Sequence, residues 1–268
     1  MKQADVFAKT LELAYKSGER ALLGGALMDQ GFTYFTQARI KDASRVLEQA
    51  RLLLEQVIPG LDLTIYLRAK IAWFNGDTED ARSLLLKDQE HLRLLEDKSL
   101  LSSVLHLLGQ LEMEAGELEQ AEAYLRESLA IEQEIGSPLG EAFVLLQLSI
   151  LANLRGDLQT FKQTLKDSLS PDRELSHLQK MHILTDILAS PFFQRPENSV
   201  QILGALAVYY RQIDRPIGPL QKRYYDLAEA TARAALGDAA FESACAEGAR
   251  LSIDEALDWM LERVEGLE

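Results

Sequence analysis

The sequence is poor in cysteine, in proline and in basic residues. Its single cysteine, Cys245, excludes an intrachain disulfide and a metal site built from several thiolates. Proline occurs only 7 times, mainly between long stretches with helical spacing. No apolar run reaches the ~18 residues that a membrane span requires, and the N-terminal residues lack the apolar core of a signal peptide. We therefore expect a cytoplasmic protein that makes no contact with a membrane.

The charge balance is strongly negative. Lysine and arginine number 28 against 42 aspartates and glutamates, which gives a net charge of −14. A nucleic-acid-binding face would show clustered basic residues, so direct nucleic-acid binding is not expected. Charged residues at 26% and hydrophobic residues at 47% are ordinary for a globular chain. A chain of 268 residues allows one or two domains and needs no disulfide or metal to stabilise its core.

A pattern of small residues recurs along residues 31–168. Each copy begins with a small residue, and the copies are shifted by 38, 40 and 40 residues: Gly31, Ala69, Gly109 and Ser149. A glycine follows at the end of the first helical stretch in three copies: Gly76, Gly116 and Gly156. A small residue inside the next stretch occurs in three copies, and the fourth has a phenylalanine: Ala43, Ala81, Ala121 and Phe161. Such periodicity is typical of stacked helical hairpins.

This pattern resembles the tetratricopeptide repeat, whose signature is Gly-x2-Tyr-x3-Gly-x4-Ala-x3-Phe-x2-Ala. Glycine at a helix end can adopt a positive φ without a Cβ clash. An acidic residue follows each glycine and suits the free N–H groups of the next helix: Asp77, Glu117 and Asp157. The period of 38 to 40 exceeds the usual 34 and indicates longer helices, as in variants from bacterial regulators.

The register also extends towards the N-terminus. Residues 2–17 match the second helix of an earlier repeat, through Phe7, Leu11, Leu13 and Ala14. Because a repeat array normally ends on a polar cap, a half repeat at the start indicates a piece of a longer chain or a partner at that end. We therefore assign residues 1–170 to a tetratricopeptide-like array, with a half repeat at 2–17 followed by four repeats.

Beyond residue 170 the regular spacing is lost, but helical patterns continue. We expect helices at about 172–190, 196–213, 218–236, 238–248 and 252–266, the last opened by a cap at Ser252 to Glu255. No flexible linker separates this segment from the array, so residues 171–268 are predicted to pack on it as a helical cap. The predicted fold is all-α: a right-handed superhelix of helical hairpins with a C-terminal helical cap.

The C-terminal segment carries a second resemblance. It rests on five runs, 203–205, 214–219, 234–241, 246–252 and 255–256. Together they are similar to the C-terminal ends of bacterial signalling proteins of the LuxR, MalT and AfsR type, in which a repeat array follows a regulatory ATPase. Cys245 departs from the pattern, which often has tryptophan there. The resemblance implies the sensor or interaction arm of such a regulator.

No pattern of catalytic residues is found. The phosphate-binding motif Gly-x4-Gly-Lys-Ser/Thr is absent, so the ATPase of those regulators does not transfer to this chain. The four histidines form no His-Glu-x-x-His motif, and Cys245 lies in a small-residue helical stretch that favours a buried, unreactive thiol. We therefore expect a protein that is not an enzyme and uses neither a cofactor nor a metal ion.

The concave groove of the superhelix is the candidate site. The first helix of each pair lines that groove, and projecting this geometry selects nine residues: Met28, Phe32, Phe35, Tyr66, Lys70, Trp73, His106, Gln110 and Met113. Tyr66, Lys70 and Trp73 are expected to share one face, which suits a ligand with an apolar body and a negative group. The alternative for each residue is ordinary packing between repeats. Of Trp73 and its neighbour Phe74, one must point inward because adjacent helical residues are ~100° apart.

The charged clamp that some tetratricopeptide grooves use for a peptide carboxyl terminus is absent. The clamp positions here are Met28, Phe32, Leu67, Ser103 and Leu107. An aromatic groove with methionines instead favours an apolar peptide or helix. Three functions follow: an interaction or sensor arm of a signalling or transcription regulator that binds a protein or peptide, a stand-alone scaffold protein, or a domain that senses a small-molecule inducer in the groove.

Overall fold

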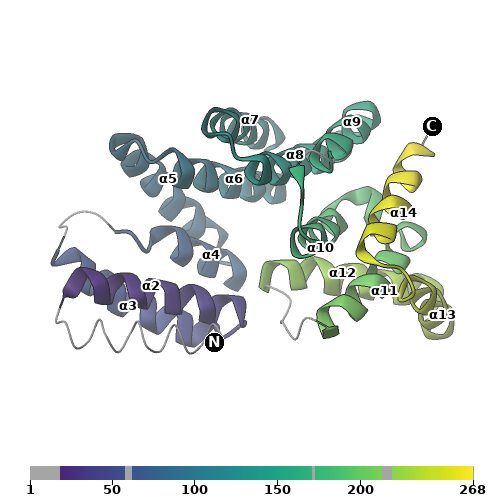
Figure 1. Cartoon of the computed structure of the whole chain (residues 1–268), viewed down its shortest axis with the longest axis horizontal. Helices are drawn as coiled ribbons and strands as arrows, with labels where there is room; N and C mark the ends of the chain where they lie inside the picture. Colours follow the sequence, from purple (N-terminus) through teal and green to yellow (C-terminus); the bar gives the residue numbers. More distant parts are fainter. Residues whose placement is uncertain (1–18, 58–61, 171–172, 213–218, 268) are drawn as a thin grey trace. The chain divides into compact units, whose positions relative to one another are not determined.

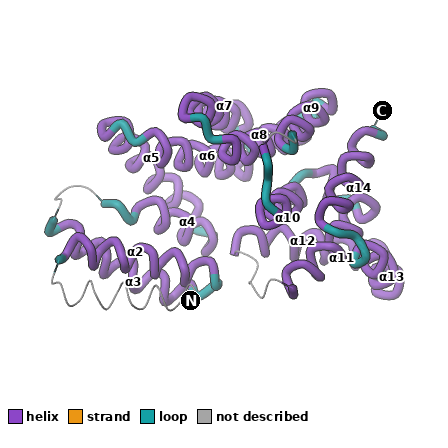
Figure 2. The backbone as a smooth tube through the Cα atoms, in the orientation of Figure 1, coloured by secondary structure: helices purple, strands orange, loops and turns teal. Residues whose placement is uncertain are grey.

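The computed structural model describes residues 19–57, 62–170, 173–212 and 219–267. Within these residues the chain forms thirteen α-helices and no β-strand (Figure 2). The predicted all-α fold built from helical hairpins is therefore confirmed. The half repeat predicted at 2–17 lies outside the described residues.

The contacts divide the chain into two compact units, residues 1–97 and 98–268. The first unit contains two helical hairpins, labelled in Figure 1: α2 (Arg20–Thr36) packs on α3 (Ile40–Glu55), and α4 (Ile65–Asn75) packs on α5 (Thr78–Leu95). These hairpins are the first and second predicted repeats. Within the unit, α4 also contacts both helices of the first hairpin.

The second unit begins with two more hairpins. These are α6 (Lys98–Ala115) with α7 (Leu118–Ile135), and α8 (Pro138–Leu154) with α9 (Leu158–Ser168). A helical block follows, made of α10 (His177–Asp186), the 3₁₀ helices η2 (Ile187–Ala189) and η3 (Pro191–Gln194), α11 (Pro196–Gln212), α12 (Pro219–Leu236), α13 (Asp238–Gly248) and α14 (Ile253–Glu265). The predicted domain boundary at residue 170 thus falls inside a compact unit.

The helix ends follow the sequence pattern closely. Gly76 has φ +90°, and its N–H donates to the carbonyl of Trp73 while the Asp77 N–H donates to the carbonyl of Ala72. The same pair of hydrogen bonds ends α6 at Gly116 and α8 at Gly156. This motif satisfies carbonyls at the helix end and needs a left-handed residue, which is why glycine recurs at this position.

The small residues of the repeat lie where paired helices approach closely. A Cβ atom added at Gly31 would lie 2.7 Å from the Leu47 side chain, and one at Gly109 would lie 2.6 Å from Leu125. Ala121 is fully buried in the third hairpin. These contacts explain why the pattern requires small side chains at these positions.

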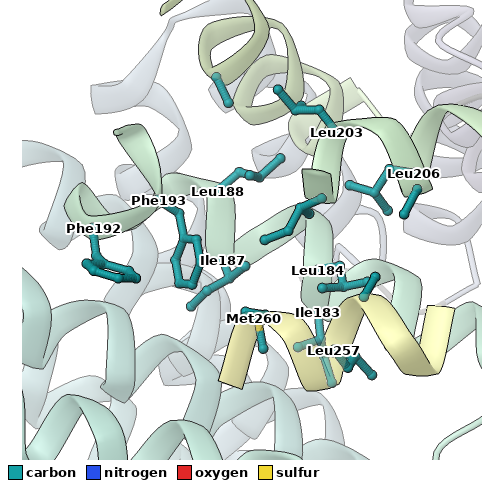
Figure 3. Close-up of a cluster of buried hydrophobic side chains, with 14 of the residues drawn as sticks. Ile183, Leu184, Ile187, Leu188, Phe192, Phe193, Leu203, Leu206, Leu257 and Met260 are labelled. Carbon is teal, nitrogen blue, oxygen red and sulfur yellow. The ribbon is translucent and has the colours of Figure 1, made fainter. Parts of the chain in front are cut away.

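The fourth hairpin and the C-terminal block share one hydrophobic core. Phe161 of α9 is fully buried, and its ring centroid lies 6.1 Å from that of Phe192 in η3. Leu257 and Met260 of α14 lie beside Ile183 of α10 in the same cluster (Figure 3). Phe161 departs from the repeat pattern because its side chain fills space that the block encloses.

The first helix of the C-terminal block differs from the expectation. The sequence predicted one helix over about 172–190, whereas α10 begins at His177 and ends at Asp186. A capping box sets its start, since the Ser176 hydroxyl accepts from the Gln179 N–H and the Gln179 side chain accepts from the Ser176 N–H. The predicted cap at Ser252 and Glu255 has the same reciprocal bonds.

Two glycines of the C-terminal motif allow α11 and α13 to cross at very short range. A Cβ atom at Gly204 would lie 2.2 Å from the carbonyl oxygen of Cys245, and one at Gly248 would lie 2.1 Å from that of Gln201. Because both neighbours are backbone atoms, no side-chain movement could make room. The crossing therefore depends on glycine at both positions.

Asp88 is a buried carboxyl in the first unit. It is 5% exposed, and its Oδ2 atom has no hydrogen-bond partner within the described residues. Burial, together with the carboxylates of Asp62 and Asp97, raises the pKa of Asp88 to about 6. The equivalent residue of the third hairpin is Ser128, which pairs with the Ser102 hydroxyl at 2.8 Å. At this position the serine side chain has a hydrogen-bond partner, whereas one oxygen of the aspartate has none.

We expect Asp88→Ser to stabilise the chain at neutral pH. A raised native pKa means that the folded state binds the proton more tightly, so the native carboxyl is best tolerated at low pH and costs stability as the pH rises towards 6 and beyond. Each pKa unit corresponds to ~1.4 kcal/mol, so the gain at pH 7 is up to about 3 kcal/mol. Chemical denaturation from pH 4 to pH 8 measures it. A difference between the variant and the native chain that does not change with pH would contradict this explanation.

Candidate functional site

The predicted groove residues of the first unit lie on its two first helices, α2 and α4. The Lys70 ammonium lies 5.4 Å from the ring centroid of Tyr66 and 5.9 Å from that of Phe35. Lys70 and Tyr66 are half-buried, and Phe35 is buried. One turn before Phe35, Phe32 is 55% exposed. The structure therefore brings Phe35, Tyr66 and Lys70 together, and we call these residues, with the exposed Phe32 one turn before Phe35 on α2, the aromatic–lysine patch.

The cation of this patch is held by aromatic faces. In the described part of the chain, Lys70 forms no ion pair, and its ammonium contacts two rings instead. Such a contact favours the cation by ~0.5–2 kcal/mol, depending on how far it is desolvated. A half-buried lysine without a carboxylate partner can still pair with an anion brought by a ligand.

Trp73 does not belong to this face, which corrects the expectation that it would join Tyr66 and Lys70. Trp73 is 1% exposed and continues a buried stripe with Ile65 and Ala69, at spacings of four residues. The half-buried Phe74 instead continues the face of Tyr66 and Lys70. Ala69, the small residue of the repeat pattern, already marked the packing stripe four residues before Trp73.

Met28 is also a packing residue. It contacts the core cluster of Leu27, Val46 and Ala50 in the first hairpin. Of the predicted residues in this unit, Met28, Phe35 and Trp73 thus support the fold, while Phe32, Tyr66 and Lys70 retain accessible surface.

In the second unit the predicted site residues all lie on α6, but they have two different environments. Met113 packs against two core clusters, one of which includes the C-terminal block. Next to it, Glu114 forms an ion pair with Arg223 of α12 and accepts a 3.4 Å hydrogen bond from the Tyr224 hydroxyl. This end of α6 is therefore covered by the chain itself. The contact between Glu114 and Arg223 could not be predicted from the sequence, because nothing in the repeat pattern relates α6 to a residue 109 positions further on.

The other end of α6 borders a pocket. His106 lines it together with Glu132 of α7 and residues of α8, and Gln110 lies one turn further along, half-buried. Glu132 was not a predicted site residue. Its only sequence signal is that the equivalent residue of the second repeat is the apolar Leu92.

Metal-ligating side chains do not converge in the described parts of the chain. No set of three His, Cys, Asp or Glu residues there could hold a metal ion. Burial, with the carboxylates of Glu242 and Glu229 nearby, raises the pKa of Cys245 to about 11, so its thiol stays protonated at neutral pH. None of the described helices combines the length and apolarity needed to cross a membrane.

Comparison with known proteins gives a structural likeness alone. No protein-family model matches the sequence, and no curated protein matches it. Among solved structures, the crystal structure of BtubC (BKLC) from P. vanneervenii is similar, with a TM-score of 0.54 and 15% sequence identity. The match covers 88% of this chain and 92% of that one. At this identity the likeness extends to the fold and no further.

Proposed function

We propose that this chain is a helical-repeat interaction protein that binds a partner peptide through the aromatic–lysine patch of α2 and α4. The observation that supports it is the half-buried Lys70 ammonium between the rings of Tyr66 and Phe35. A partner that places an acidic side chain on Lys70 and an apolar side chain on the exposed Phe32 would match both groups. The ligand class is thus a peptide with a carboxylate next to an aromatic or aliphatic residue.

The first unit favours an anionic group at this point even though the whole chain has a net charge of −14. Long-range attraction between exposed charges is screened within ~8–10 Å at physiological salt, so the local cation governs the contact. Because Lys70 is already partly removed from water, pairing with a carboxylate requires less further desolvation than at an exposed lysine.

Selection from a displayed random-peptide library tests this proposal. Peptides selected on the native chain should carry Asp or Glu beside an apolar residue, and their binding to Lys70→Met should weaken by ~1–3 kcal/mol. Methionine keeps an apolar stem and removes the charge. Lys87→Met, at an exposed lysine of α5, is the matched control and should bind as the native chain does.

Phe32→Ser should also weaken the selected peptides, while the helix content measured by circular dichroism stays unchanged because Phe32 is exposed. Equal affinity of the native chain and Lys70→Met for every selected peptide would contradict the proposal.

The wider role that we propose is the interaction or sensor arm of a bacterial signalling or transcription regulator. The support for it is the resemblance of the C-terminal segment, together with the α11–α13 crossing at Gly204 and Gly248, two glycines of that segment. An in-frame continuation of the coding sequence upstream of Met1 into an ATPase domain is the observation that tests it. A stand-alone reading frame would favour the scaffold alternative.

A further inference from the structure

A pocket of about 270 Å³ lies between α6, α7 and α8 of the second unit. Glu132 of α7 and Gly140 of α8 form one side, and His106 lines it from α6. Leu139 and Phe143 add apolar surface, and Ser103 adds a hydroxyl. A water molecule takes ~30 Å³ of the liquid, and pockets for drug-sized ligands begin at ~300 Å³. The space therefore suits one side chain or a similarly small molecule.

Glu132 is the unusual residue of this pocket. It is 8% exposed, and within the described residues its carboxylate forms no ion pair and no side-chain hydrogen bond. Two other glutamates of α7 lie nearer the surface and do form ion pairs, Glu134 with Lys98 and Glu122 with Arg126. A largely buried carboxylate without a counter-ion has lost part of its hydration, so a cation placed in the pocket beside it would be favoured.

The position of this carboxylate is built into the fold. A Cβ atom at Gly140 would lie 1.8 Å from the Glu132 Oε2 atom, so the carboxylate in this position packs directly on the Gly140 backbone of α8. Gly140 lies in the first turn of α8, whose Ser137 hydroxyl already accepts the Gly140 N–H. The Gly140 N–H therefore already has an acceptor and does not donate to the Glu132 carboxylate.

The remaining pocket surface fits the rest of an amine ligand. The Ser103 hydroxyl donates to the Ser99 carbonyl at 3.2 Å, which leaves the lone pairs of its oxygen to accept from a ligand N–H. Leu139 and Phe143 can cover a short alkyl stem. An ammonium group has three N–H donors and one positive charge, so it could pair with the carboxylate and donate a hydrogen bond to the hydroxyl oxygen.

We propose that this pocket binds an alkylammonium group, either the lysine side chain of a partner protein or a small free amine. The inference does not rest on the proposed function, because the aromatic–lysine patch lies on α2 and α4 and prefers a ligand of opposite charge. The two sites can therefore fail independently, and Lys70→Met should leave amine binding unchanged.

Ligand-observed NMR on the full chain, with n-butylammonium as the probe, tests the pocket. Butylammonium should bind the native chain, whereas 1-butanol and butyrate should not, because they lack the positive charge. Glu132→Gln keeps the shape of the side chain and should weaken butylammonium at least tenfold, which is about 1.4 kcal/mol. Glu134→Gln removes the same charge from the exposed surface of α7 and should bind as the native chain does.

Equal binding of butylammonium to the native chain and to Glu132→Gln would overturn the proposal. Equal binding of butylammonium and 1-butanol to the native chain would also overturn it. The second comparison needs no variant, so the test stands even if Glu132→Gln does not fold.

A second pair of probes separates the two sources of the amine. An acetylated and amidated Gly-Lys-Gly peptide presents the lysine side chain, and the matching norleucine peptide lacks only its charge. Tighter binding of the lysine peptide than of butylammonium assigns the pocket to a partner's lysine, and the reverse order assigns it to a free amine. No binding of either amine by the native chain rejects the alkylammonium site altogether.

Discussion

Trp73→Ala should lower the free energy of unfolding by ~3–5 kcal/mol, the usual range for removing a large buried aromatic side chain. The side chain is 1% exposed and continues the buried stripe of Ile65 and Ala69 on α4. Truncation would leave a cavity that the neighbouring helices could close only in part. Chemical denaturation followed by far-UV circular dichroism measures the loss.

The adjacent Phe74 supplies the control for this experiment. Phe74 is half-buried on the face of Tyr66 and Lys70, so Phe74→Ala should cost clearly less stability than Trp73→Ala. A Trp73→Ala variant that keeps native stability but loses affinity for peptides would contradict this prediction and show that Trp73 takes part in binding.

Removing the C-terminal block should abolish cooperative folding of the hairpins that remain in the second unit. A chain ending at Ser170 would expose Phe161 and Leu165, which are fully buried in the core shared with Phe193. Fully burying one such side chain contributes ~1.5–3 kcal/mol, and several are uncovered together. We expect fragment 98–170, which contains only those two hairpins, to aggregate or to bind hydrophobic dyes without a cooperative thermal transition.

Fragment 98–268 is the matched comparison, because it is cut between the two compact units instead of inside one. It should unfold cooperatively in the same assay. A soluble fragment 98–170 with a sharp thermal transition would show that the C-terminal block does not complete the core of the fourth hairpin.

The sequence was sufficient for features that depend on a few neighbouring residues. The spacing of small residues predicted the helical hairpins, and Gly76, Gly116 and Gly156 marked helix ends because the left-handed conformation selects glycine. The cap at Ser252 was readable for the same reason, since its reciprocal hydrogen bonds join residues three positions apart.

Orientation on a single helix was only partly readable. Tyr66 and Lys70 were correctly placed on one face, and the requirement that Trp73 and Phe74 point in different directions is met. Which of the two points inward depends on the neighbouring helices. The spacing of four residues from Ala69 favoured Trp73, but an aromatic residue beside a lysine equally fits a binding surface.

The sequence alone determined the helical class, the repeat register and the helix ends marked by glycine in the repeats, because periodicity and local hydrogen bonds fix them. Only the tertiary structure decided that Phe161 completes a core with Phe192, and that α12 covers Glu114. It also decided that Glu132 lies buried against Gly140. Each of these arrangements depends on how whole helices pack against one another, and no local pattern of residues encodes the volume that such packing leaves to be filled.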